Sequence, residues 1–238
     1  MGEVERCREQ APTSPWMGEV ERCREQAPRY LVVTLLALLI AACATPPVLP
    51  PKENPQLAWR DRQAQLLPLT SWKLAGRVAV RSAQEGGQVS MRWERNSQGE
   101  NIDLSGPLGR GLIRLQQDEN GARLQDSNQR VHTAPNAEAL LFNTTGWRIP
   151  LEGLHYWIRG LPAPDAPTRQ ELDDQGRLAI LWQSGWEIRF LAYTRFGLYD
   201  LPSRLTLILP QEVLSAVPGG AHSPVEARLI IERWLQLQ

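Results

Sequence analysis

The sequence predicts a mainly β protein, an antiparallel sheet of about eleven strands that closes into a barrel or curves strongly. Two observations carry this prediction. Apolar and polar residues alternate with a period of two over many short segments, as in Leu74, Val78 and Val80 against Lys73 and Arg77, which is typical of strands with one buried face. These segments recur at short and even spacing with turn residues between them, and that pattern favours a barrel.

The elements are expected in a definite order along the chain. A first helix spans 57–70, where good helix formers precede Pro68, and proline ends a helix. Two short helices later interrupt the strands, one capped by Asn136 and one over 151–158. The segment 210–224 is a long loop to which the sequence gives no role. Strands are expected at 73–81, 89–94, 102–104, 111–116, 121–126, 129–133, 169–174, 177–183, 186–193, 203–209 and 225–236.

The N-terminal segment has the features of a processed leader. Its apolar run 31–40 has the length of a signal-peptide h-region and is too short to span a bilayer comfortably. Ala42 admits a signal peptidase, and the cysteine after it resembles a bacterial lipobox. Cys43 would then carry an N-terminal diacylglycerol and an N-acyl chain such as palmitate. The alternatives are an ordinary membrane anchor, or a secretory signal with a chance cysteine.

The chain therefore divides into three parts. Residues 1–42 are the leader, in which residues 1–12 recur identically at 17–28, and such a perfect repeat indicates a recent duplication or a misplaced start rather than a fold repeat. Residues 43–56 are the modified cysteine and a Pro-rich tether. Residues 57–238 form one domain with a sizeable core.

Composition limits the partners of this domain. Removal of the leader leaves 196 residues with 21 basic and 20 acidic side chains, a balance that argues against nucleic acid as a partner. Cys43 is the only cysteine left, so the sequence predicts no disulfide. Ala44 follows it, where an Asp usually retains a lipoprotein in the inner membrane, so by resemblance the outer membrane is expected.

The sequence offers no catalytic or metal-binding motif. It contains no Walker loop, no Gly-x-Ser-x-Gly, no His-Glu-x-x-His and no Cys-x-x-Cys. Neither an enzyme, a metal nor a cofactor beyond the lipid on Cys43 is therefore expected, and a hydrolase with an unrecognised site is disfavoured. Asp173-Asp174 is interpreted as a turn. The histidines 132, 155 and 222 are interpreted as isolated structural residues, and the arginines 77, 92, 110, 114, 148, 159 and 189 mostly as solvated strand faces.

The tryptophans are the most informative apolar residues. Five of them fall on apolar faces of the expected strands and helices and are candidates for a hydrophobic binding cavity. A small barrel either fills its interior with side chains or leaves room for a ligand, and the pattern alone allows both a tryptophan-rich core and a cavity wall. These candidates are Trp93, Trp157, Trp182, Trp186 and Trp234.

Three stretches give the mature chain a family resemblance. They are Trp59 to Ala79, the turn Gly106-Pro107-Leu108-Gly109, and the segment from Ile149 to Pro162 with Leu172 to Leu178 after it. Together with the lipobox they resemble the LolB family, outer-membrane lipoproteins that receive other lipoproteins from the periplasmic carrier LolA. The segment 150–162 is the most specific part, and the resemblance covers about 57–238.

The resemblance implies an incomplete, half-open antiparallel barrel with a few short helices forming a lid and an apolar cavity for acyl chains. It implies a lipid-anchored monomer at the outer membrane that faces the periplasm, with a LolA-like carrier and lipoprotein cargo as partners. By position, Leu108 corresponds to an exposed leucine needed to deliver cargo to the membrane. The alternative is a non-catalytic structural or assembly lipoprotein with a filled core.

Overall fold

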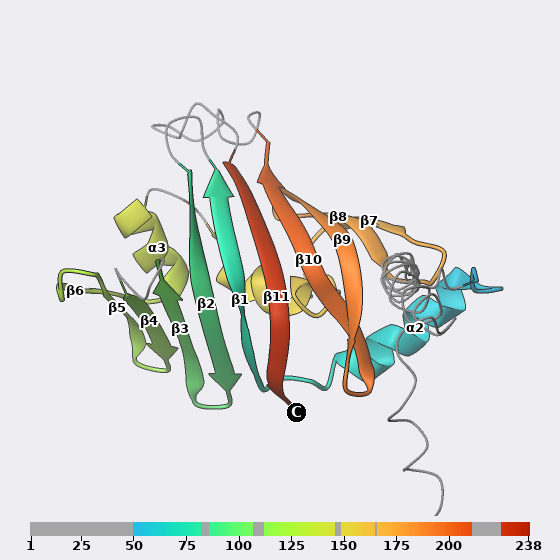
Figure 1. The fold of residues 1–238 in the computed structure, drawn as a ribbon, viewed down its shortest axis with the longest axis horizontal. Helices are drawn as coiled ribbons and strands as arrows, with labels where there is room; N and C mark the ends of the chain where they lie inside the picture. The colour runs from blue at the N-terminus through green and yellow to red at the C-terminus, as the bar shows by residue number, and fades with distance from the viewer. Residues whose placement is uncertain (1–49, 82–85, 107–111, 146–148, 165, 211–224) are drawn as a thin grey trace, which may run out of the picture. The chain divides into compact units, whose positions relative to one another are not determined.

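The computed structural model describes residues 50–238 except 82–85, 107–111, 146–148, 165 and 211–224. Eleven strands form one sheet in the order β6-β5-β4-β3-β2-β1-β11-β10-β9-β8-β7 (Figure 1). Every neighbouring pair is antiparallel. The outermost strands β6 and β7 do not pair, so the sheet stays open, and the predicted mainly β, incomplete barrel is confirmed.

The strands form two meanders joined at the middle of the sheet. The first meander runs from β1 to β6 and the second from β7 to β11, and β1 pairs with β11 to join them. The strands are β1 (Trp72–Arg81), β2 (Gly86–Asn96), β3 (Gly99–Ser105), β4 (Ile113–Asp118), β5 (Gly121–Gln125), β6 (Val131–Ala134), β7 (Thr168–Leu172), β8 (Leu178–Gln183), β9 (Trp186–Phe196), β10 (Tyr199–Leu209) and β11 (Val225–Leu237).

In the described part of the chain, three helices accompany the sheet, α2 (Pro55–Leu66), α3 (Ala137–Thr145) and α4 (Leu151–Trp157). α4 bridges the two meanders, because His155 contacts Glu100 of β3 and Trp157 bonds to Gln183 of β8. In Figure 1 it lies behind β1 and β11. We call the sheet face that α4 covers the inner face and the opposite one the outer face.

The helix and strand limits differ from the sequence prediction at a few points. α2 begins at Pro55, inside the segment assigned to the tether, because Asn54 caps it by accepting a hydrogen bond from the Leu57 amide at 3.0 Å. β10 begins at Tyr199 and contains Pro202, which the sheet accommodates by register irregularities on both sides of Arg204. Within the described ranges, no helix is long and apolar enough to cross a bilayer.

Candidate functional site

The inner face of the sheet is closed at one end by a continuous row of large apolar side chains. The row crosses six neighbouring strands in the order β11, β1, β2, β3, β4 and β5, with one residue from each strand, and successive residues are cross-strand partners. All but Trp234 are buried, so side chains fill this end of the sheet. The row is Trp234, Leu74, Trp93, Ile102, Leu115 and Leu124.

Aromatic rings under α4 complete this closed end. Trp72 lies edge-on to Trp93 and to Trp234, with ring centroids 6.2 Å and 6.5 Å apart, the geometry that aromatic pairs prefer. The His155 ring of α4 lies 5.8 Å from Trp72 and 5.6 Å from Trp93. We call these four residues the aromatic cluster, and it joins α4 to strands β1, β2 and β11.

His155 of the aromatic cluster also forms a buried acid–base pair with Glu100. Glu100 and His155 are each about 2% exposed, and His155 Nε2 lies 2.9 Å from Glu100 Oε2, which also accepts a hydrogen bond from Trp93 Nε1 at 2.9 Å. Burial lowers the pKa of His155, but the hydrogen bond to Glu100, the negative charge of Glu100 and the Glu152 carboxylate 3.5 Å from Nδ1 together raise it by more, so the pKa lies above its ordinary value. The pair therefore favours a charged imidazolium that joins α4 to β3.

Arg159 holds the helices together from within the core. Only 3% exposed, it donates hydrogen bonds to the backbone carbonyls of Leu66, Leu69 and His155 at 3.0, 2.7 and 2.9 Å. Its guanidinium also lies over the Trp72 ring. Burial lowers the pKa of Arg159 to about 10, so it stays charged at neutral pH. The sequence interpretation of Arg159 as a solvated strand residue was wrong, because the side chain turns inward to the carbonyls at the end of α2.

Toward the other end of the strands the inner face stays apolar but becomes half-exposed. Beyond the buried row, successive inward residues of β1 are Gly76, Val78 and Val80, and the last two are only partly buried. On β3, β4 and β11, Leu104, Ile113 and Ala227 are also only partly buried and pack against the core. Leu229 of β11, and Leu207 and Leu209 of β10, remain buried at this end. We call this surface the apolar wall. It consists of Val78, Val80, Leu104, Ile113 and Ala227.

The structure separates the five predicted tryptophans. Trp93 and Trp234 belong to the aromatic cluster, and Trp157 and Trp186 are buried beside Gln183, which accepts a hydrogen bond from Trp157 Nε1 at 2.9 Å. Trp93, Trp157 and Trp186 therefore lie in the packed core, and the partly buried Trp234 packs against it.

Trp182 is placed on the opposite side of the sheet. It lies on the outer face opposite Glu187, to which it is hydrogen-bonded, and beneath the guanidinium of Arg169. The period of two along β8 sends Leu181 and Gln183 inward and Trp182 outward, so this place does not fit an acyl-chain cavity. The other predicted site residues, Cys43 and Leu108, lie outside the described residues.

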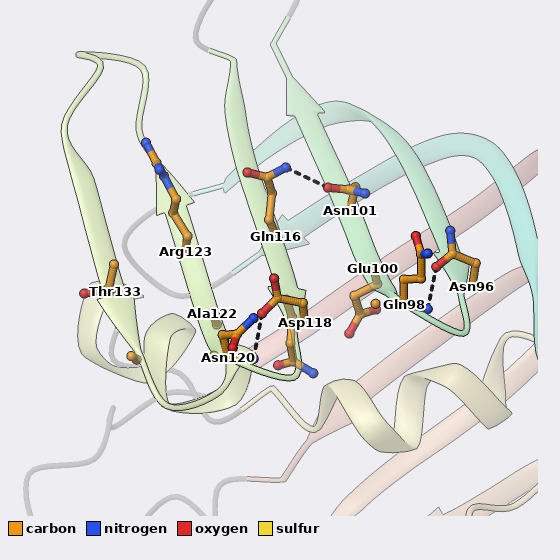
Figure 2. Close-up of a pocket in the computed structure, with 14 residues that line it drawn as sticks. Asn96, Gln98, Glu100, Asn101, Gln116, Asp118, Asn120, Ala122, Arg123 and Thr133 are labelled. Carbon is orange, nitrogen blue, oxygen red and sulfur yellow. Dashed lines mark hydrogen bonds between the residues drawn. The ribbon is translucent and has the colours of Figure 1, made fainter.

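A polar hollow of about 540 Å³ lies near the β2–β3 and β4–β5 turns (Figure 2). Gln116 donates a hydrogen bond to Asn101 at 2.9 Å across it. Such amide-rich walls do not favour an apolar ligand, so this hollow is a poor candidate for hydrocarbon. Its labelled polar lining in Figure 2 is Asn96, Gln98, Glu100, Asn101, Gln116, Asp118, Asn120, Arg123 and Thr133.

Sequence reasoning missed several residues of the site. Trp72, Glu100 and Arg159 were not selected, and His155 was interpreted as an isolated structural histidine. The signal for Trp72 was present, since it begins the alternation that continues at Leu74. No local pattern pairs Glu100 with His155, because 55 positions separate them along the chain.

Comparison with known proteins gives consistent matches. A family model described as "Outer membrane lipoprotein LolB" matches residues 70–234. An outer-membrane lipoprotein LolB of Pseudomonas putida is 38% identical over 182 residues, which cover 75% of this chain and 88% of that protein. The protein of the same name from Stutzerimonas stutzeri is 36% identical over 182 residues, which cover 74% of this chain and 87% of that one.

Proposed function

Because the chain belongs to the LolB family of outer-membrane lipoproteins, we propose that it receives lipoproteins from a LolA-type periplasmic carrier and places them in the outer membrane. The observation that supports the binding step is the apolar wall. A half-exposed apolar surface that continues from a closed core is suited to cover hydrocarbon at its open end and to stop it at the other.

The energetics of the cargo explain why such a surface is needed. Burial of one CH₂ group is worth about 0.8 kcal/mol, so a single acyl chain is worth on the order of 10 kcal/mol. A receptor must supply most of this shielding, or the chain will not leave its carrier. The sequence has no nucleotide-binding motif, so we expect transfer to follow increasing affinity from carrier to receptor to bilayer.

The N-terminal segment gives the domain its place in this proposal. We propose that Cys43 carries the lipid anchor, that the domain faces the periplasm, and that the Pro-rich tether raises its effective concentration at the membrane. The amide of Lys52 donates to the Asp174 carbonyl at 2.8 Å, which fixes the domain end of the tether. The nine residues from Cys43 to Lys52 then reach about 30 Å at most.

Two other proposed features follow from the family. We propose that the protein works as a monomer and catalyses no covalent step, with lipoprotein acyl chains as its cargo. The structural or assembly lipoprotein is the rival function. The filled aromatic end of the sheet agrees with a filled core, but the family and the half-exposed apolar wall favour the receptor.

A transfer assay with purified components tests the proposal. LolA loaded with a lipoprotein is mixed with the full chain, and cargo on each protein is measured after separation. We expect cargo to move to the wild-type chain and Val80→Asp to reduce this movement at least ten-fold, because a charge on the apolar wall opposes hydrocarbon binding. Cargo that stays on LolA with the wild-type chain would contradict the proposal.

The matched control places the same charge away from the apolar wall. Leu198 is 80% exposed at the β9–β10 turn, so Leu198→Asp should leave transfer within two-fold of the wild type. Circular dichroism and the midpoint of thermal unfolding establish that both variants are folded. Equal losses in the two variants would remove the apolar wall from the proposed site.

A further inference from the structure

The outer face of the four central strands has an excess of positive charge. On β2, β1, β11 and β10, seven basic side chains face outward against three acidic ones, which leaves four positive charges. The formal net charge of the whole chain is zero, so charge is segregated onto this face. The basic residues are Lys73, Arg77, Arg81, Arg92, Arg204, Arg228 and Arg233, and the acidic ones are Glu94, Glu226 and Glu232.

Each acidic side chain of this face is already paired. Lys73 binds Glu94 at 2.7 Å, Arg77 binds Glu232 at 2.6 Å, and Arg228 binds Glu226 at 2.7 Å. The remaining arginines are exposed and form no ion pair or hydrogen bond with any residue in the described part of the chain. These are Arg81, Arg92, Arg204 and Arg233. Arg81 ends β1 beside the segment 82–85, which lies outside the described residues, so we call only Arg92, Arg204 and Arg233 the free arginines.

The register of the sheet sets the spacing of these arginines. Arg92 and Arg233 both lie opposite Ala75, one on each side, so they are two strand spacings apart, which is about 10 Å. Arg204 lies opposite Ile230, which in turn lies opposite Arg77. Because the side chain of Ala75 is short, nothing between Arg92 and Arg233 on this row extends as far as their guanidinium groups, and one anionic surface is able to meet both.

We propose that this face binds the phosphate groups of anionic phospholipids. The guanidinium is planar and always charged, and it suits phosphate oxygens. A bilayer offers many such groups in one plane, which matches charges spread over four strands. A protein partner fits less well, because the centre of a protein interface is rich in apolar residues and arginine but poor in lysine and glutamate, whereas Lys73, Glu94 and Glu232 lie within this face.

The proposal goes beyond cargo transfer and does not depend on it. Each basic residue near an anionic membrane strengthens binding about five-fold, so the free arginines orient the domain without holding it irreversibly. The face then rests on lipid headgroups while the opposite, inner face stays free. Binding of this kind is screened by salt.

Vesicle binding of the full chain tests the proposal. The probes are vesicles of phosphatidylcholine alone and vesicles with one third phosphatidylglycerol, and the readout is the ratio of binding to the two. This ratio cancels contributions of the apolar leader that do not depend on headgroup charge. We expect the wild-type chain to prefer anionic vesicles at 0.1 M salt, and Arg92→Gln/Arg233→Gln to reduce the preference at least ten-fold.

Control variants separate this surface from charge in general. Arg60→Gln/Arg123→Gln removes two exposed arginines on α2 and β5 and should change the ratio at most two-fold. Arg92→Lys/Arg233→Lys keeps the charge and should retain most of the preference. A wild-type chain without a preference, or equal effects of the two glutamine variants, would overturn the proposal. So would unchanged vesicle binding combined with impaired cargo acceptance from LolA, which would assign the face to an acidic protein instead.

Discussion

At the scale of single residues, Arg159 is the most unusual feature of the core. A buried charge is costly unless it is fully hydrogen-bonded, and Arg159 meets this need with three backbone carbonyls. Two of these carbonyls lie at and just after the end of α2, where helix carbonyls lack intrahelical partners, and the Leu66 carbonyl otherwise accepts only the longer hydrogen bond from the Leu69 amide at 3.2 Å. One side chain thus stabilises the end of α2 and fixes it to α4.

Replacement of Arg159 by methionine should lower the free energy of unfolding by about 3 kcal/mol, because three carbonyls lose hydrogen bonds to a charged donor. Urea denaturation of the two proteins measures this difference. Arg60→Met is the matched control, since Arg60 is an exposed arginine on α2, and its effect should stay within about 0.5 kcal/mol. Similar effects of the two substitutions would contradict the role given to Arg159.

The pair of His155 and Glu100 predicts how stability depends on pH. The pKa of His155 is raised in the folded protein, so its contribution is fully present below about pH 6.5 and is lost as pH rises through the folded-state pKa. Wild type and His155→Gln should therefore differ most in unfolding free energy near pH 5.5, and less near pH 8.5. Glu100→Gln should weaken this trend. A difference that grows with pH would refute the assignment.

At the scale of elements, the first turn of α2 packs against the β7–β8 turn. Asp173 and Asp200 both bind Arg177, at 2.8 and 3.0 Å, and this fixes the turn to the start of β10. Gly176 has a φ of +69° and faces α2, where an added Cβ would come within 2.8 Å of the Ala58 Cβ. Glycine is therefore required here both by backbone conformation and by space.

Gly176→Ala should lower the free energy of unfolding by about 3 kcal/mol, since it combines a left-handed conformation with a clash against α2. Gly197 is a suitable comparison, because its φ is +60° but nothing lies within 4 Å of an added Cβ. Gly197→Ala should cost only about 1 kcal/mol. Thermal or urea unfolding measures both values, and equal costs would show that contact with α2 contributes nothing.

At the scale of the whole molecule, local patterns were enough to predict the strands but not how the two halves of the sheet join. The period of two gave all eleven strands, and Asn136 and Pro68 marked helix limits within a few residues. The family resemblance supplied the openness of the barrel, which periodicity alone left undecided. The pairing of β1 with β11 brings together residues some 155 positions apart, as in Arg77 and Glu232, and nothing local in the sequence shows such a contact.

The candidate site was predictable only in its general character. Alternation identified Val78 and Val80 as inward residues, but it does not show how far each is buried, which depends on the residues packed around it in the folded protein. The same limit explains the tryptophans, because a period of two assigns a face without showing which face is covered. The alternation predicts both Trp182 and Trp186 on apolar faces of strands, yet the β8–β9 turn places them on opposite faces of the sheet.

Delivery of cargo to the membrane is the proposed step that involves the whole molecule, and substitution of Leu108 tests it. The family resemblance implies an exposed leucine at this turn, and a charged residue resists entry into a bilayer by a few kcal/mol. Leu108→Glu should therefore accept cargo from LolA within two-fold of the wild type but deliver it to vesicles about ten-fold more slowly. Leu198→Glu provides the control at another turn and should deliver normally. If acceptance depends on the apolar wall and delivery on the turn, as we propose, the double variant Val80→Asp/Leu108→Glu should fail already at acceptance. If Leu108→Glu delivers as fast as the wild type, Leu108 has no part in the site.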